Sequence, residues 1–211
     1  MLFGDPKFKP MADAAKAAVR STANFNWSFI ALLAIVVIFY INEWKQRNCK
    51  AIAAALALYS VHWFYEIFNA LICHWSGYAL WTVSPESTSF ILLIGVSWEL
   101  SMMFAIAGFT SKLLPEDGKM KIMGCNNRVV FAVGSALLFS LIEIFLASTP
   151  AFIWVYRWWG AIPVFITTYI PFFLASYLTY DAKPANQKKF IGIMVVVDLA
   201  LLVVLVPLGI I

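Results

Sequence analysis

Six apolar stretches of about 20 residues each dominate the chain and limit what it can fold into. About 20 consecutive apolar residues allow a helix to cross the roughly 30 Å of hydrocarbon in a bilayer. Because 63% of the 211 residues are hydrophobic and only 12% are charged, the chain has too little polar surface for a soluble domain of this size. We therefore predict an integral membrane protein of the all-α class, a polytopic bundle of six transmembrane helices. The predicted spans are residues 26–44, 51–74, 88–111, 129–148, 160–180 and 189–210.

A short segment with both small apolar and charged residues precedes the first span. Residues 10–20 (PMADAAKAAVR) are typical of an amphipathic helix that lies at the membrane surface. The first 25 residues lack the apolar core of a cleavable signal peptide. We therefore divide the chain into an N-terminal interfacial segment, residues 1–25, and a single transmembrane domain, residues 26–211.

The 15 lysine and arginine residues are distributed unevenly between the two sides of the predicted bundle. Ten lie in the first, third and fifth loops, whereas five lie in the N-terminal segment and the fourth loop. Because positively charged loops tend to stay in the cytoplasm, both termini are predicted to lie outside, in the cytoplasmic membrane if the chain is prokaryotic. This placement indicates membrane orientation and no nucleic-acid partner. The expected partners are the lipid bilayer and a hydrophobic lipid substrate, and an oligomer is compatible with the sequence.

Polar side chains follow one face of the second predicted span. At 100° per residue, His62, Glu66, Asn69 and Cys73 lie within about 60° of one another around the helix. A run of polar groups on an otherwise apolar helix indicates that this face points into the bundle. We therefore expect the stripe to form one wall of a polar pocket.

Three other predicted spans each contain one acidic residue: Glu99, Glu143 and Asp198. A charged side chain in the middle of a bilayer costs about 2.5–3.5 kcal/mol on insertion scales, so acids that face lipid are disfavoured. We predict that Glu99 and Glu143 meet His62 and Glu66 in the pocket. These four residues are the predicted catalytic groups.

The fifth predicted span contains a proline. Pro171 has no amide hydrogen and would free the carbonyl of Thr167. Thr168 and Tyr169 lie at the same level and are predicted to offer hydroxyl groups to a ligand. An ordinary proline kink is the other interpretation.

Aromatic residues crowd the second and fourth loops, in residues 74–81 (HWSGYALW) and 152–159 (FIWVYRWW). Tryptophan and tyrosine favour the headgroup level of a bilayer, which predicts an aromatic belt. The alternative is that these loops cover the mouth of a cavity.

Acid–base chemistry on a lipid is the function that these residues favour. Acids gathered at low dielectric are not all ionised, and a protonated glutamate beside a histidine is a general acid. Protonating a double bond of an isoprenoid or sterol-like lipid makes a carbocation, which needs a dry site and aromatic faces. We therefore predict an intramembrane isomerase or cyclase without a cofactor, in which Asn69 orients a substrate hydroxyl or carboxyl group. The predicted substrate contacts are Trp63, Tyr65, Asn69, Trp98, Met102, Thr168 and Tyr169.

The same acids allow three other functions. One is a metal site made by His62, Glu66, Glu99 and Glu143, although bundle metal sites usually offer histidines from two helices. Another is a small proton- or ion-coupled transporter, although the chain shows no internal repeat. In a non-catalytic subunit of a membrane complex, the acids would only tie helices together.

Residues 55–105 resemble the emopamil-binding (EXPERA) family, whose best-known member is a sterol isomerase. The resemblance rests on the His62-x-x-x-Glu66 pair, the LW at 80–81, the SF at 89–90 and Glu99. It implies that His62, Glu66 and Glu99 move a double bond through a carbocation. The family usually has five spans, and it carries an Asn and a Trp before the proline of its fifth span, where this chain has 167–169 (TTY).

Small membrane-bound terpene cyclases are a second group that the sequence is similar to. They place a glutamate after an aromatic residue on an early span and an aspartate on the last span, and Glu66 and Asp198 match these positions. Both resemblances imply carbocation chemistry on a hydrophobic lipid.

Overall fold

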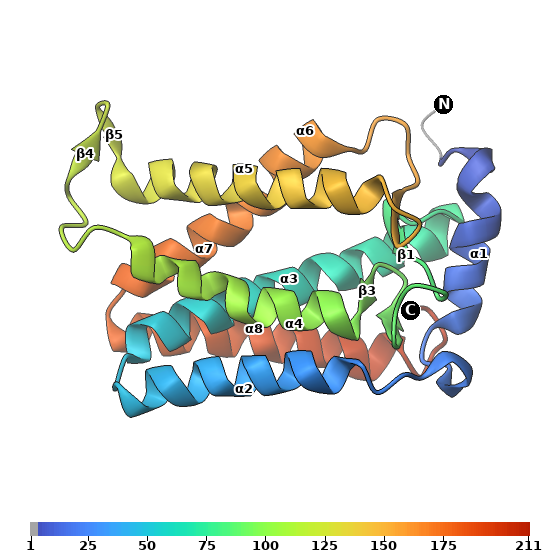
Figure 1. The fold of residues 1–211 in the computed structure, drawn as a ribbon, viewed down its shortest axis with the longest axis horizontal. Helices are drawn as coiled ribbons and strands as arrows, with labels where there is room; N and C mark the ends of the chain where they lie inside the picture. The colour runs from blue at the N-terminus through green and yellow to red at the C-terminus, as the bar shows by residue number, and fades with distance from the viewer. Residues whose placement is uncertain (1–3) are drawn as a thin grey trace.

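The computed structural model describes residues 4–211, and most of its helices run side by side along one axis (Figure 1). The main helices are α2 (Phe29–Lys45), α3 (Cys49–Ser76), α4 (Trp98–Ala107), α5 (Asn127–Ala147), α7 (Ile170–Asp181) and α8 (Pro184–Leu205). A short helix, α6 (Ala161–Val164), and a π-helical turn, Phe165–Tyr169, continue directly into α7 and form one rod, Ala161–Asp181. Residues 1–3 of the predicted interfacial segment lie outside the described residues.

Within residues 4–211, three helices are long and apolar enough to cross a membrane by length and composition: α3, α5 and the Ala161–Asp181 rod. The outer faces of α2, α5 and α8 expose large apolar side chains. Ile38 is 63% exposed, Phe145 is 68% exposed and Val203 is 71% exposed. Apolar surface of this extent suits contact with lipid. The mostly helical class predicted from the sequence is confirmed.

The third predicted span, residues 88–111, is wrong in its first ten residues. Ile91–Leu93 (β2) and Val96–Ser97 (β3) pair as a tight antiparallel hairpin, and α4 begins only at Trp98. A short apolar run suits a buried strand as well as a membrane helix, and periodicity alone does not separate the two. The hairpin therefore replaces the first part of the predicted span.

α1 (Lys9–Ala18) lies crosswise at one end of the bundle, close to the C-terminus (Figure 1). Its Ala12 and Ala15 are buried, while most of its charged side chains are exposed. This helix is the amphipathic segment predicted over residues 10–20, with slightly different bounds.

The two aromatic loops pair with each other at the same end of the bundle. β1 (Trp81–Val83) and β6 (Phe152–Trp154) are antiparallel, and Trp81 lies directly opposite Trp154. The pairing joins segments that are about 70 residues apart and lays them over the ends of α3 and α5. A second hairpin, β4 (Lys121–Ile122) with β5 (Cys125–Asn126), extends from the opposite end (Figure 1).

Two ion pairs fasten the loops at that opposite end. Glu43, only 1% exposed, accepts hydrogen bonds from the Lys112 ammonium at 2.5 Å and the Asn48 amide at 2.7 Å. Arg128 donates to both carboxylate oxygens of Asp181, at 2.6 and 2.8 Å. The Glu43–Lys112 pair connects α2 with the 3-10 turn that follows α4, and the Arg128–Asp181 pair connects α5 with α7.

α3 is the central helix, and its small residues let its neighbours approach closely. Ala54, Ala55 and Ala57 are fully buried. Gly108 begins a 3-10 turn, Gly108–Leu113, that lies against α3, and a Cβ on Gly108 would come within 2.4 Å of the Ala55 Cα. Contacts between small residues are a common way to join helices in membranes.

The helix irregularity predicted at Pro171 is a π-helical turn over Phe165–Tyr169. The Thr167 carbonyl accepts a hydrogen bond from the Tyr65 hydroxyl of α3 at 2.8 Å. Membrane helices tolerate such a freed carbonyl when a neighbouring helix supplies the donor. Tyr65, predicted to contact substrate, therefore makes a contact that joins two helices.

Candidate active site

A narrow cavity lies between α3, α4, α5 and the Ala161–Asp181 rod, on the side toward β1 and β6. Its volume is only about 30 Å³, so the cavity is narrow. Most of its walls are apolar or aromatic. Five residues predicted from the sequence line it: His62, Glu66, Glu143, Thr168 and Tyr169.

His62 and Glu66 lie one turn apart on α3 and face the cavity together. Nε2 of His62 is 3.4 Å from Oε1 of Glu66, without hydrogen-bond alignment, and both side chains are almost fully buried. The imidazole stacks on Phe104, with ring centroids 4.1 Å apart. Neither ring nitrogen of His62 has a hydrogen-bond partner within residues 4–211. Because unpaired buried polar atoms are costly, this imidazole favours a polar ligand or water beside it.

The Trp81 side chain binds the Glu66 carboxylate. Its indole N–H lies 3.2 Å from each carboxylate oxygen. Asn69 holds the backbone here: its Oδ1 accepts from the Leu80 N–H at 2.8 Å, and its Nδ2 donates to the Trp81 carbonyl at 3.0 Å. The Asn69 amide, predicted to orient a substrate, instead positions the tryptophan that binds Glu66.

Gly95, in the turn between β2 and β3, packs against the same group. A Cβ at this position would lie 2.4 Å from Nε1 of Trp81, 2.4 Å from Nδ2 of Asn69 and 2.6 Å from Oε2 of Glu66. Only a residue without a side chain fits so close to these three polar atoms. The β2–β3 hairpin therefore forms part of the wall behind Glu66.

Glu143 enters the cavity from α5 and is also bound by a tryptophan. Oε1 accepts a hydrogen bond from the Trp154 indole at 2.6 Å, and Oε2 accepts one from the Tyr169 hydroxyl. These donors satisfy the carboxylate oxygens without adding positive charge. In the described chain, the ion pairs that involve lysine or arginine include neither Glu66 nor Glu143.

Two more polar atoms in the cavity walls lack a partner among the described residues. They are Oγ1 of Thr168 and Nε1 of Trp159, on side chains that are more than nine-tenths buried. The Trp159 ring stacks on Trp81, with ring centroids 5.8 Å apart. With His62, these atoms give the cavity several unused hydrogen-bonding groups that a polar part of a ligand would satisfy.

Glu99 is not among the residues that line this cavity, which does not fit the prediction that it meets His62 and Glu66 there. Because a hairpin replaces the start of the predicted span, Glu99 falls in the first turn of α4. Its Oε1 accepts a hydrogen bond from the Ser89 N–H at 2.8 Å. A carboxylate at a helix N-terminus is stabilised by the helix dipole.

Three predicted substrate contacts also lie outside the cavity. Trp98 stacks on Phe29, with ring centroids 5.2 Å apart. Trp63, which follows His62 on α3 and so faces another direction, borders a groove on the outer surface. Met102 is buried, but it is the neighbouring Met103 that lines the cavity.

The tryptophans that bind the two carboxylates were not identified from the sequence. Trp81 and Trp154 lie in the aromatic loops, for which composition predicts either a belt or a cover over a cavity. The sequence offers one further indication of strands in these loops, because residues 81–83 (WTV) and 152–154 (FIW) are of types that favour strands. Which strand pairs with which is not visible in a single sequence.

The predicted alternative of a metal site finds no support in residues 4–211. No group of three His, Cys, Asp or Glu side chains in this part of the chain is arranged to hold an ion. Glu99, one of the four expected ligands, does not line the cavity.

Two comparisons relate the chain to known proteins. A family model described as "Uncharacterized membrane protein family" matches residues 9–207. An Archaeoglobus fulgidus protein, described as "Uncharacterized protein", is 38% identical over 198 residues, which cover 92% of this chain and 94% of that relative. No solved structure matches. The resemblance to sterol isomerases and terpene cyclases stays a prediction, and the chain belongs to the uncharacterized membrane protein family that its residues 9–207 match.

Proposed function

We propose that the protein is a membrane-embedded enzyme that rearranges a hydrophobic isoprenoid or sterol-like lipid by acid–base catalysis. The observation that carries this proposal is the presence of Glu66 and Glu143 in one buried cavity with His62. Both carboxylates are held by neutral donors, so no lysine or arginine fixes either of them as an anion. In the proposed reaction one of these two acids is the proton donor and the other is the proton acceptor.

Double-bond migration uses such a pair in two steps. The protonated carboxyl transfers its proton to one alkene carbon, and a carbocation forms at the neighbouring carbon. The other carboxylate removes a proton from the adjacent C–H, and the electron pair of that bond becomes the new double bond. Cyclisation begins with the same proton transfer. Phe104 and Tyr169, whose rings stack 6.2 Å apart, offer aromatic faces to the cation.

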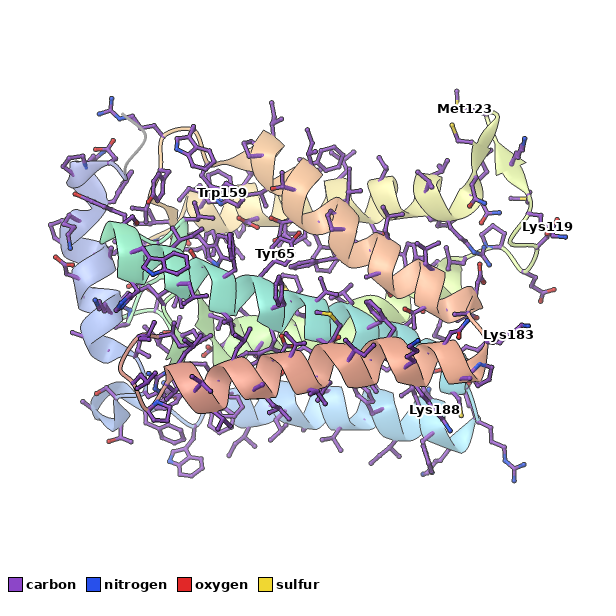
Figure 2. All side chains as sticks on the ribbon, turned by 180° about the vertical axis from the view of Figure 1, so that it is seen from behind. Tyr65, Lys119, Met123, Trp159, Lys183 and Lys188 are labelled. Carbon is purple, nitrogen blue, oxygen red and sulfur yellow. The ribbon has the colours of Figure 1, made fainter. Side chains whose placement is uncertain are left out.

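Substrate access involves the wall formed by Trp81 and Trp159. These two rings line both the cavity and a larger apolar groove on the outer surface. Tyr65 and the half-exposed Phe68 also line the groove, and Figure 2 shows Tyr65 and Trp159 between α3 and the Ala161–Asp181 rod. Because the cavity is narrow, a lipid chain reaches Glu66 only when this tryptophan pair moves apart.

Solvent deuterium tests the proposal whichever lipid is the substrate. Purified protein in vesicles of its native membrane lipids is incubated in deuterated water, and the lipids are analysed by mass spectrometry. We expect one lipid species to gain carbon-bound deuterium or to change its double-bond position. Glu66→Gln and Glu143→Gln should each lower this rate by about a hundredfold or more, the usual contribution of a general acid or base.

Glu99→Gln is the matched control, because it is the same substitution in an acid that lies outside the cavity. We expect this variant to keep the wild-type rate. An equal loss in Glu99→Gln would show that the cavity is not the reacting site, and unchanged lipids in every sample would overturn the proposed reaction. Proton uptake by sealed vesicles that requires Glu66 and leaves the lipids unchanged would instead favour a transporter.

We further propose that six segments cross the bilayer and that both termini lie outside. The supporting observation is the charge distribution, with Lys119, Lys183 and Lys188 at one end of the bundle and Trp159 toward the other (Figure 2). Ten of the 15 lysine and arginine residues fall in the first, third and fifth predicted loops, and positively charged loops tend to stay in the cytoplasm.

The native cysteines provide a direct test of this topology. Cys49 and Cys125 are exposed in the basic loops, whereas Cys73 is buried. A membrane-impermeant maleimide should label Cys49 and Cys125 in inside-out vesicles but not in intact cells. Labelling of either residue from outside the cell would contradict the proposed orientation.

A further inference from the structure

The His62 imidazole is a buried polar group that the two proposed proton transfers do not use. It is only 1% exposed, and neither ring nitrogen has a hydrogen-bond partner within residues 4–211. A neutral imidazole has one N–H donor and one acceptor nitrogen, so both nitrogens can bind a small polar molecule. The Glu66 carboxylate, 3.4 Å from Nε2, is not aligned for a hydrogen bond. Because unpaired buried polar atoms cost free energy, a ligand beside this ring is favoured.

The size of the cavity decides which ligand fits beside His62. Its volume is about 30 Å³, whereas sites for small molecules usually have roughly 300–1,000 Å³. A buried water molecule needs roughly 10–15 Å³ of such space. The cavity therefore suits water, and it is too small for a lipid headgroup or a sugar.

The cavity walls offer the polar partners that a buried water requires. Such a water makes roughly two to four hydrogen bonds to polar groups that otherwise lack partners. Besides His62, the cavity is lined by Thr168 and Trp159, whose Oγ1 and Nε1 atoms are buried and unpartnered among the described residues. Glu66 and Glu143 also line it, and each carboxylate oxygen can accept more than one hydrogen bond. Donors and acceptors for a water are thus both present.

The proposed reaction leaves its two acids in the wrong protonation states for a second turnover. The donor ends ionised and the acceptor ends protonated. A proton must therefore pass from one carboxyl to the other before the next lipid can react. The hydrogen bonds that these carboxylates accept within the described chain come from aromatic side chains, and none joins Glu66 to Glu143 directly. A group between the acids is needed to carry the proton.

We propose that the cavity binds ordered water at His62, and that this water returns the proton between Glu66 and Glu143 after each turnover. The protonated acid gives its proton to the water oxygen as the water gives one of its own protons to the ionised acid, so the water is regenerated. His62 is a positioning residue that holds the water. The relay role rests on the proposed function, whereas the water site does not.

Nuclear magnetic resonance of the full-length protein in detergent tests the water site without a lipid substrate. The chain has two histidines, His62 and the exposed His74, so labelled histidine gives two sets of ring signals, and His74→Phe assigns them. Carbon-bound ring protons do not exchange with solvent. A cross-peak between them and water therefore reports a water molecule at the ring, and we expect one for His62. A His62 ring without it, or with cross-peaks to detergent chains instead, would overturn the site.

The relay is tested by His62→Phe, which keeps a ring against Phe104 but removes both nitrogens. The first turnover uses the proton already on the donor, whereas every later one needs the relay. We therefore expect the steady-state rate to fall by about a hundredfold, a usual contribution of one proton-transfer group, and the first-turnover rate to fall much less. His62→Gln, which can still bind water, should recover part of the steady-state rate.

His74→Phe is the matched control, because it is the same substitution on the same helix at a residue that does not line the cavity. It should change neither rate. Equal losses in the first and later turnovers of His62→Phe would overturn the relay. Isotopically labelled oxygen passing from water into the lipid would do so too, because the water would then be a reactant. Wild-type protein that binds the water but leaves every lipid unchanged would overturn the proposed function and the relay together, and the water site would remain.

Discussion

Trp81 and Trp154 are direct partners in the β1–β6 ladder, and their indole N–H groups bind two different carboxylates, Glu66 and Glu143. Residues that lie opposite each other in an antiparallel ladder project to the same face. One pair of strands therefore covers the cavity and holds both acids. The position of each acid depends on this ladder as well as on its own helix.

Removing one of these indole donors should destabilise the protein. Trp81→Phe keeps a ring against Trp159 but leaves the buried Glu66 carboxylate without its N–H partner. We expect a loss of about 1–3 kcal/mol in the free energy of unfolding, measured by denaturant titration in detergent. Trp158→Phe, at a position that is 50% exposed, is the control and should change stability little. Equal stability of both variants would show that the Trp81–Glu66 bond contributes nothing.

A methyl group at Gly95 should disturb the cavity. Gly95→Ala places a Cβ 2.4 Å from Nε1 of Trp81 and 2.6 Å from Oε2 of Glu66. We expect a loss of about 1–3 kcal/mol, which is usual for overpacking, together with altered tryptophan fluorescence. Gly134→Ala is the control, since nothing lies within 4 Å of a Cβ there, and it should be neutral or stabilising in a helix. Wild-type stability in Gly95→Ala would contradict the close packing.

The Arg128–Asp181 pair should hold α5 to α7. Asp181→Asn leaves the Arg128 guanidinium, whose side chain is only 4% exposed, without its counter-charge. Because Asp181 is 38% exposed and water screens it, we expect a loss of about 1–3 kcal/mol, less than for a fully buried pair. Glu116→Gln, at an exposed position nearby, should have no effect on the thermal midpoint in a side-by-side melt.

Acid should loosen the N-terminal segment from the fourth loop. Arg157 binds the Asp5 carboxylate at 2.8 Å and Lys7 N–H binds it at 3.0 Å, and these contacts lower the pKa of Asp5 below its ordinary value of 3.8. Because the pKa of the Asp5 carboxyl is lowered, its ionised form stabilises the contact above pH 3.8. This stabilisation is lost as the pH falls through the lowered pKa. Amide hydrogen exchange, corrected for its intrinsic pH dependence, should show residues 5–8 losing protection in acid.

Asp5→Asn should show weak protection at every pH, because its side chain is never charged. Asp13→Asn, which alters an acid of the same segment outside this contact, should keep the wild-type pH dependence. A wild-type segment whose protection is constant down to acid pH would rule out the proposed contribution of the Asp5 carboxylate.

Local periodicity was enough to predict several features. The face of α3 that carries His62, Glu66 and Asn69 is buried as the 100° spacing requires. The proline at position 171 indicated an irregular helix, and a π-helical turn directly precedes it. These predictions succeed because they depend on residues within one or two helical turns of each other.

The prediction for Glu99 failed because the chain between residues 88 and 97 satisfies its backbone in a hairpin and not in a helix. An apolar run containing Gly95 is compatible with both structures. Whether this run forms a hairpin or a helix depends on contacts with other segments, such as those of Trp81 and Asn69 with Gly95. Periodicity contains no information about such contacts.

The sequence by itself determined that this protein is apolar and helical and which helix faces are polar, because these properties follow from side-chain chemistry and helical spacing. Only the tertiary structure decided that Glu66 and Glu143, and not Glu99, share a cavity. That choice depends on hydrogen bonds from paired tryptophans about 70 residues apart, whose partners are fixed only when the strands meet.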